Sequence, residues 1–131
     1  MNFQAIIKRY EAPMLELLNC VPRPFNETLN QHLPRKGGIY RVFEVIDEPH
    51  HYTTIYIGRT NDLQHRIYDD LYLGKASTPL RDILARTPDI KDVKTYLEEH
   101  CRVQIAVVPD LEERTYLKWF ACAVLRPTHN L

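Results

Sequence analysis

Four residues of this sequence have the types and spacing for chemistry on phosphate. A Gly-Ile-Tyr tripeptide ends at Tyr40, a Tyr-Ile-Gly tripeptide begins at Tyr56, and Arg66 and Asn130 follow them. Two phenols, a guanidinium and an amide facing one point would suit phosphodiester hydrolysis. Together they could help deprotonate a water and stabilise the negative charge that builds on phosphorus. The planar guanidinium of Arg66 would hold phosphate oxygens more directionally than a lysine.

Each of these residues also has a purely structural interpretation. A tyrosine in a strand is commonly a half-buried packing residue. Arg66 could pair with Asp70, four residues further along the same helix. Asn130 could cap the chain end. The chemical interpretation therefore depends on whether the fold brings the four together.

A β-hairpin is the element that would position the tyrosines. Residues 38–46 and 53–59 are β-branched and aromatic, with a polar loop between them. A loop centred near residue 49 places Tyr40 opposite Gly58 and diagonal to Tyr56. Because side chains alternate across a strand, both phenols should then lie on one face of the sheet.

The remaining pattern predicts an α/β (α+β) fold, a small three-stranded antiparallel sheet flanked by helices. Pro13 either kinks the first helix or begins a second one, and the proline-rich stretch 21–25 should be irregular. We expect an N-terminal helical arm over residues 1–32 and a second unit over 33–131. The expected helices cover 2–19, 62–73, 78–86, 89–100 and 111–125, with one helical turn near 28–32 and a buried strand over 102–108.

Composition narrows the class of protein. The 131 residues carry 17 basic and 17 acidic side chains, so any contact with nucleic acid must be a local site. No apolar run approaches the ~20 residues of a membrane-spanning helix, and the charged N-terminus is unlike a signal peptide. The three cysteines are far apart and suggest reduced thiols. We therefore expect a cytoplasmic protein that is not bound to a membrane.

The tripeptides, Arg66 on the following helix and Pro127-Thr-His-Asn130 near the end resemble the motifs of the GIY-YIG nuclease superfamily, in the same order. The resemblance covers about residues 33–131. It implies a DNA endonuclease that uses Mg²⁺ or Mn²⁺, and cutting both strands of a duplex would call for a homodimer. It also implies roles: Tyr40 activates water, Tyr56 assists, Arg66 holds the scissile phosphate and Asn130 supports the site. The nucleic-acid contacts expected from it are Arg59, His65, Arg66 and Lys75.

The chain departs from the family at the metal ligand. The family has a glutamate nine residues before the proline of Pro-x-x-Asn, and counting back from Pro127 reaches Lys118. On a helical wheel Lys118 lies at the margin of an expected core stripe, where it could still face a cleft. An ammonium would repel Mg²⁺, so we predict no metal ligand here and place Lys118 among the catalytic positions. The stripe consists of Leu117, Phe120, Ala121, Val124 and Leu125.

Three explanations for Lys118 remain open at this point. The glutamate could have been exchanged in this chain to remove a toxic activity. The protein could have lost hydrolysis and kept nucleic-acid binding. The ammonium could itself supply the positive charge that a metal would give the transition state. The alternative to an endonuclease is therefore a non-cleaving module that binds nucleic acid or a protein partner on a degenerate nuclease fold.

Overall fold

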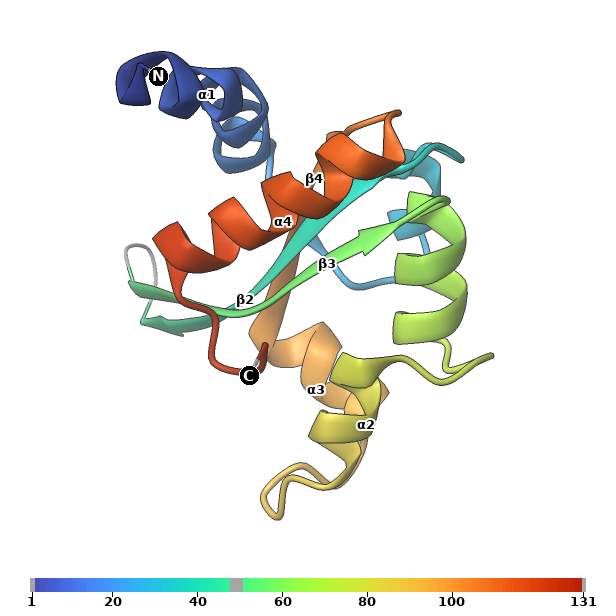
Figure 1. The fold of residues 1–131 in the computed structure, drawn as a ribbon. Helices are drawn as coiled ribbons and strands as arrows, with labels where there is room; N and C mark the ends of the chain where they lie inside the picture. Colours follow the sequence, from blue (N-terminus) through green and yellow to red (C-terminus); the bar gives the residue numbers. More distant parts are fainter. Residues whose placement is uncertain (1, 48–50, 131) are drawn as a thin grey trace.

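A computed structural model describes residues 2–47 and 51–130, without the side chains of residues 47 and 51. The predicted loop centre near residue 49 lies outside the described residues. Helices surround one sheet, and the two described ends of the chain are well separated (Figure 1). The elements are α1 (Phe3–Asn19), β1 (Arg23–Pro24), η1 (Leu29–His32), β2 (Gly38–Asp47), β3 (His51–Thr60), η2 (His65–Tyr72), α2 (Pro79–Ala85), α3 (Val93–His100), β4 (Cys101–Val107) and α4 (Leu111–Leu125).

The antiparallel sheet has the strand order β1-β4-β2-β3. The predicted α+β class is confirmed, but the sheet has four strands where three were expected. The extra strand, β1, is the two residues Arg23 and Pro24 paired with β4. The proline-rich stretch can contribute it because an edge strand tolerates a proline, which has no N–H to donate.

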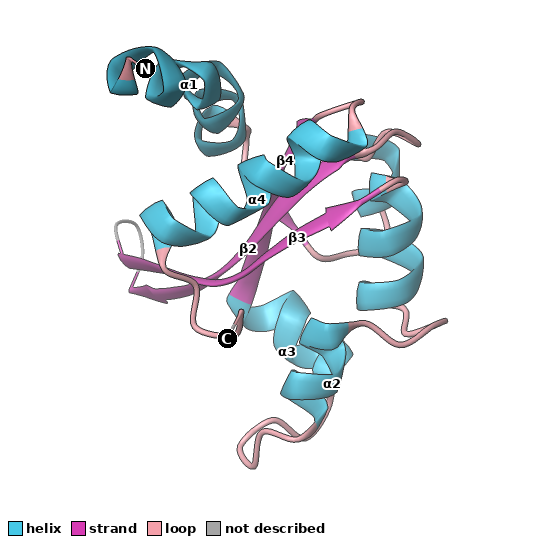
Figure 2. Cartoon of the chain, in the orientation of Figure 1, coloured by secondary structure: helices cyan, strands magenta, loops and turns pink. Residues whose placement is uncertain are grey.

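The helices form a layer on each face of the sheet (Figure 2). Alternation along β2 separates the two faces, since Ile39 contacts one core cluster and Tyr40 the other. The Ile39 face packs against α1 and α4 through Met14 and Leu117. The Tyr40 face packs against η2, α2 and α3.

Several predicted boundaries agree with the structure. Helix α4 covers the predicted span 111–125, and α1 runs through Pro13 as one helix. Thr78 caps α2 by accepting a hydrogen bond from Arg81 N. Helix α3 begins at Val93, later than predicted, because Asp92 is its cap.

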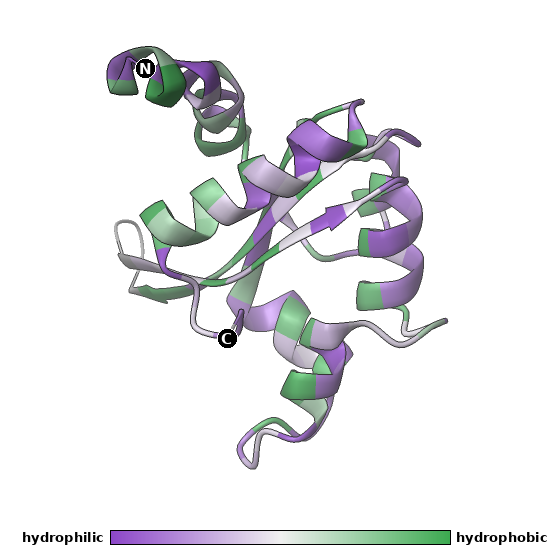
Figure 3. Ribbon diagram, viewed as in Figure 1, coloured by the Kyte–Doolittle hydropathy of each residue, from purple (hydrophilic) through white to green (hydrophobic). Residues whose placement is uncertain are grey.

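Helix η2 differs from the predicted α-helix in its winding. Leu73 N donates to Tyr68 O at 3.0 Å, the i→i+5 bond of a π-helix, a form often found near functional sites. Leu63, Ile67 and Leu71, spaced four residues apart, are fully buried and form the apolar edge of this segment. Figure 3 shows the apolar side of η2 facing the sheet and its polar side facing away.

Candidate active site

The two tyrosines meet as the alternation of the hairpin predicts. Tyr40 pairs with Gly58 and Val42 with Tyr56, so both phenols lie on one face with ring centroids 6.1 Å apart. Both side chains are buried. A Cβ at Gly58 would lie 2.2 Å from the Tyr40 ring, so the second tripeptide requires glycine to make room for the first tyrosine.

The glycine of the first tripeptide also allows a close approach. A Cβ on Gly38 would lie 2.2 Å from the Ala106 carbonyl oxygen and 2.9 Å from the Leu63 side chain. A larger residue would push β4 and Leu63, which lies just before η2, away from β2. Both glycines therefore determine how closely the elements carrying the site pack together.

Arg66 lies on η2, half-buried, where its charge acts on both phenols. Within residues 2–47 and 51–130 its guanidinium has no hydrogen-bond or salt-bridge partner, so the alternative pairing with Asp70 is not formed. His65 approaches Asp70 instead, with 3.6 Å between Nε2 and Oδ1. The guanidinium of Arg66 is thus available for a ligand.

Asn130 fixes the strand that carries Tyr56. Its Oδ1 accepts from Ile57 N at 2.9 Å, and its Nδ2 donates to Ile57 O at 2.8 Å. The backbone of Thr128 and His129 also donates to β3, which is the edge strand on this side of the sheet. The Asn130 amide therefore stabilises the backbone of β3 at Ile57, next to Tyr56.

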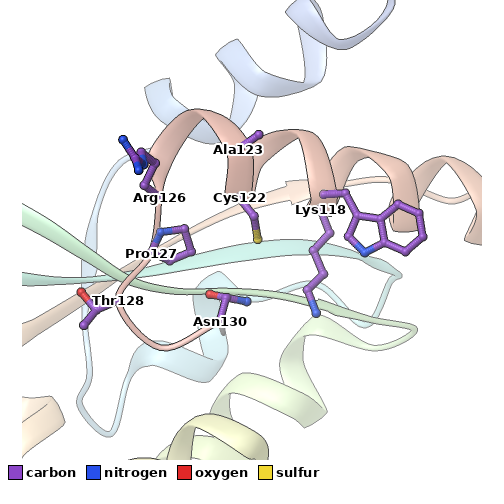
Figure 4. Close-up of a pocket in the computed structure, with 8 residues that line it drawn as sticks. Lys118, Cys122, Ala123, Arg126, Pro127, Thr128 and Asn130 are labelled. Carbon is purple, nitrogen blue, oxygen red and sulfur yellow. The ribbon is translucent and has the colours of Figure 1, made fainter.

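Lys118 reaches the same edge of the sheet from α4. Its Nζ lies 6.0 Å from the centre of the Tyr56 ring. Lys118, Cys122 and Asn130 project into a shared cavity of about 570 Å³ (Figure 4). The cavity is lined by Lys118, Trp119, Cys122, Ala123, Arg126, Pro127, Thr128 and Asn130.

Burial sets the protonation of the site. It raises the pKa of Tyr40 strongly, Tyr56 adds to the shift, and Arg66 opposes it. Burial also raises the pKa of Tyr56, again against the effect of Arg66. Both phenols are consequently protonated at neutral pH and offer hydrogen bonds. Burial raises the pKa of the Cys122 thiol too, with Lys118 acting in the opposite direction.

Asp70 is a site residue that the sequence analysis did not select. Its side chain is buried, it contributes to the raised pKa of Tyr40, and its Oδ1 has no hydrogen-bond partner among the described residues. A buried acceptor without a donor is costly and needs an explanation. The signal was present, because Asp70 follows Ile67 by three residues and so falls on the apolar edge of its helix.

The other predicted nucleic-acid contacts lie at the periphery. Arg59 is exposed and donates to the Thr115 hydroxyl of α4 at 2.6 Å. Lys75 is exposed beyond η2, with its Nζ 3.9 Å from an Asp69 oxygen. His65 is exposed and forms a contact of 3.2 Å with Asp69. The structure thus brings together Tyr40, Tyr56, Arg66, Lys118 and Asn130, and leaves Arg59 and Lys75 outside that group.

The fold is GIY-YIG nuclease-like. Among solved structures, the chain is similar to the GIY-YIG N-terminal endonuclease domain of UvrC from Thermotoga maritima. One structure is a tyrosine-to-phenylalanine mutant bound to its catalytic divalent cation, with 18% identity, a TM-score of 0.51, and coverage of 81% of this chain and 99% of that one. The magnesium-bound domain has 19% identity and a TM-score of 0.49, with the same coverages. No family model matches the chain, and no curated protein matches it.

The residues of this chain do not fit the divalent cation that the fold implies. Mg²⁺ takes oxygen ligands, usually carboxylates. The expected glutamate position holds Lys118, whose ammonium group is positively charged. In the described part of the chain, no group of three or more His, Cys, Asp or Glu side chains could hold a metal ion. That same part contains no helix long and apolar enough to span a membrane.

Proposed function

We propose that this chain is a DNA endonuclease that hydrolyses a phosphodiester at the cluster of Tyr40, Tyr56, Arg66 and Lys118. The observation that carries the proposal is that polar side-chain groups of this cluster have no hydrogen-bond partner among the described residues. In the described structure, the Arg66 guanidinium has no hydrogen-bond or salt-bridge partner, and neither phenol hydroxyl forms a hydrogen bond. Polar side-chain groups that lie together without protein partners are available to a ligand.

Arg66 and Lys118 are the residues that would bind the phosphate. They approach Tyr56 from two elements, η2 and α4. A guanidinium can form two parallel hydrogen bonds to a phosphate, and an ammonium supplies a compact charge. Lys118 would stabilise the negative charge that develops as the water oxygen bonds to phosphorus and the P–O ester bond breaks.

Asp70 is the proposed final acceptor of the water's proton. Tyr40 can relay a proton, but its raised pKa means that it cannot remain a phenolate at neutral pH. The carboxylate of Asp70 acts electrostatically on Tyr40 and has an open acceptor atom. In this scheme Tyr40 orients the water and passes its proton on, while Tyr56 donates a hydrogen bond to the phosphate. The leaving oxygen takes up a proton from solvent, and Asp70 later returns its proton to solvent.

A cleavage assay tests the proposal. Labelled single- and double-stranded DNA are incubated with the wild-type chain, Tyr40→Phe, Arg66→Ala and Lys118→Glu, each in EDTA, Mg²⁺ or Mn²⁺. We expect wild-type cleavage that survives EDTA and is lost in all three variants. Cleavage by Lys118→Glu alone, and only with a metal, would show that Lys118 suppresses hydrolysis.

The second candidate function is DNA binding without cleavage, and Lys118 is the observation that favours it. An ammonium at the position of a metal ligand can still attract phosphate. This function predicts salt-dependent binding by the wild-type chain, with intact DNA recovered in Mg²⁺ and Mn²⁺. Arg66→Ala should weaken that binding, whereas Tyr40→Phe should change it little.

A further inference from the structure

Trp119 is a large apolar side chain left on the surface beside the proposed site. It is the single tryptophan of the chain, and it is 60% exposed. It lines the same cavity as Lys118 and Asn130. An exposed tryptophan beside a cavity is typical of a surface that contacts a ligand.

Tyr116 holds this tryptophan in a defined orientation. Their ring centroids lie 5.4 Å apart with an angle of 83° between the planes, an edge-to-face arrangement. Such a pair places the edge of one ring against the face of the other, so at least one face of the indole remains open. Tyr116 is itself 45% exposed, one helical turn before Trp119. The two rings form an aromatic platform on the outside of α4.

The charges around the platform match a nucleic-acid strand. The cavity is lined by two cations, Lys118 and Arg126, and by no carboxylate. The chain as a whole is neutral, so this is a local concentration of positive charge. Aromatic rings beside a cationic groove are the combination that binds single-stranded nucleic acid, with bases stacking on the rings and phosphates following the charge.

The platform favours a single strand over a duplex. In a duplex the faces of the bases are covered by their neighbours, and the strand presents mainly sugar and phosphate to a protein. An unpaired base has an open face that can stack on the indole. Trp119 lines the same cavity as Lys118, whose Nζ lies 6.0 Å from the centre of the Tyr56 ring, so a base on the platform would place its strand next to the phosphate site.

We propose that Trp119 stacks on an unpaired base, which makes single-stranded DNA the ligand of this site. The inference rests on the proposed function, because it names the form of DNA that reaches Arg66 and Lys118. Trp119 is a substrate-positioning residue here and takes no part in the bond changes.

The tryptophan itself reports the contact. An oligothymidylate and a hairpin duplex, each carrying fluorescein, are titrated with the full-length chain in EDTA. Indole fluorescence reports stacking, and fluorescein anisotropy reports binding. We expect the single strand to bind with quenching of the indole, and the duplex to bind more weakly with little quenching. Trp119→Ala should weaken single-strand binding on the order of tenfold, and Trp119→Phe should retain most of it.

Phe3→Ala is the matched control, because it removes an exposed aromatic ring of α1 that belongs neither to the platform nor to the cavity, and it should bind as the wild type does. Single-strand binding without indole quenching, or with equal affinity in Trp119→Ala, overturns the stacking inference and leaves the proposed function intact. Absence of anisotropy change with either DNA overturns both. If raising the protein concentration without DNA quenches the indole fluorescence, and sedimentation shows a dimer, a second copy of the chain covers the platform. That result also overturns the inference.

Discussion

The chain uses tyrosine in two ways on the same face of its sheet. Tyr72 donates to the Glu98 carboxylate at 2.5 Å, and Tyr96 donates to Glu44. Tyr40 and Tyr56 are also buried, but their hydroxyls have no hydrogen-bond partner within the described residues. The hydroxyls of the first pair are used within the fold, and those of the second pair remain available to a ligand.

This difference separates residues that hold the fold from residues available to a ligand. Burial raises the pKa of all four tyrosines, so the pKa values alone do not distinguish the two pairs. The two pairs are distinguished by whether the hydroxyl has a hydrogen-bond partner. Variants of the two regions should therefore divide into those that lower the free energy of unfolding and those that change DNA binding or cleavage.

The largest effect on stability should come from Gly58→Ala. The added Cβ would lie 2.2 Å from the buried ring of Tyr40, which must move or push the strands apart. We expect the free energy of unfolding to fall by about 3 kcal/mol, the upper end for overpacked cores, and DNA binding to be lost with it. Urea denaturation measures the first and anisotropy the second.

A double variant sharpens this prediction. Tyr40→Ala removes the ring that the new Cβ would meet, so Gly58→Ala should cost far less in that background. Equal costs in both backgrounds would mean that the ring does not determine the need for glycine at position 58.

Tyr96→Phe should have the next largest effect, on stability alone. Loss of the hydrogen bond to Glu44 should lower the free energy of unfolding by about 1–2 kcal/mol, with unchanged DNA affinity. Burial and that hydrogen bond raise the pKa of Tyr96 in the folded state. Its contribution is therefore complete below the unfolded pKa of about 10 and is lost as the pH rises through the higher folded value.

The wild type should accordingly lose more stability than Tyr96→Phe when the pH is raised above about 10. Thermal unfolding of both chains over that range checks the slope. Parallel curves would argue against a shifted tyrosine at this position.

Asp70→Asn should have a smaller effect on stability and in the opposite direction. Its buried Oδ1 has no hydrogen-bond partner in the described structure, and His65 Nε2 lies 3.6 Å from it, so replacing the carboxylate with a neutral amide should leave stability unchanged or raise it by up to about 1 kcal/mol. Cleavage should fall on the order of a hundredfold if Asp70 accepts the proton. A destabilised variant that still cleaves would assign Asp70 to the fold instead of the site.

The sequence predicted local geometry where a short-range rule applies, and it failed to predict burial where tertiary packing decides. The alternation of a hairpin is local, so the shared face of Tyr40 and Tyr56 followed from register alone. The helical wheel of α4 placed Val124 in the core, but it is 54% exposed. A wheel does not show where neighbouring helices lie.

Two tertiary contacts of α4 show which of its side chains become buried. Tyr10 of α1 stacks on Phe120 with 4.9 Å between ring centroids, which sets the direction from which this helix is covered. Arg114 is buried as well, with its guanidinium donating to the Val108 and Pro109 carbonyl oxygens at 3.0 Å. Neither contact has a local signal in the sequence, and the same holds for the π-helical winding of η2.

Arg66→Ala should show the smallest effect on stability together with a large loss of binding. The guanidinium has no hydrogen-bond or salt-bridge partner in the described residues, so its removal should change the free energy of unfolding by less than about 0.5 kcal/mol. A hydrogen bond to a charged group contributes about 1.5–3 kcal/mol, so DNA affinity should fall roughly ten- to a hundredfold. Arg86→Ala, on the exposed end of α2, is the matched control and should change neither quantity. Lower stability with unchanged affinity would place Arg66 with Tyr72 and Tyr96 among the structural residues, and the contrast between the two regions would then no longer separate fold from function.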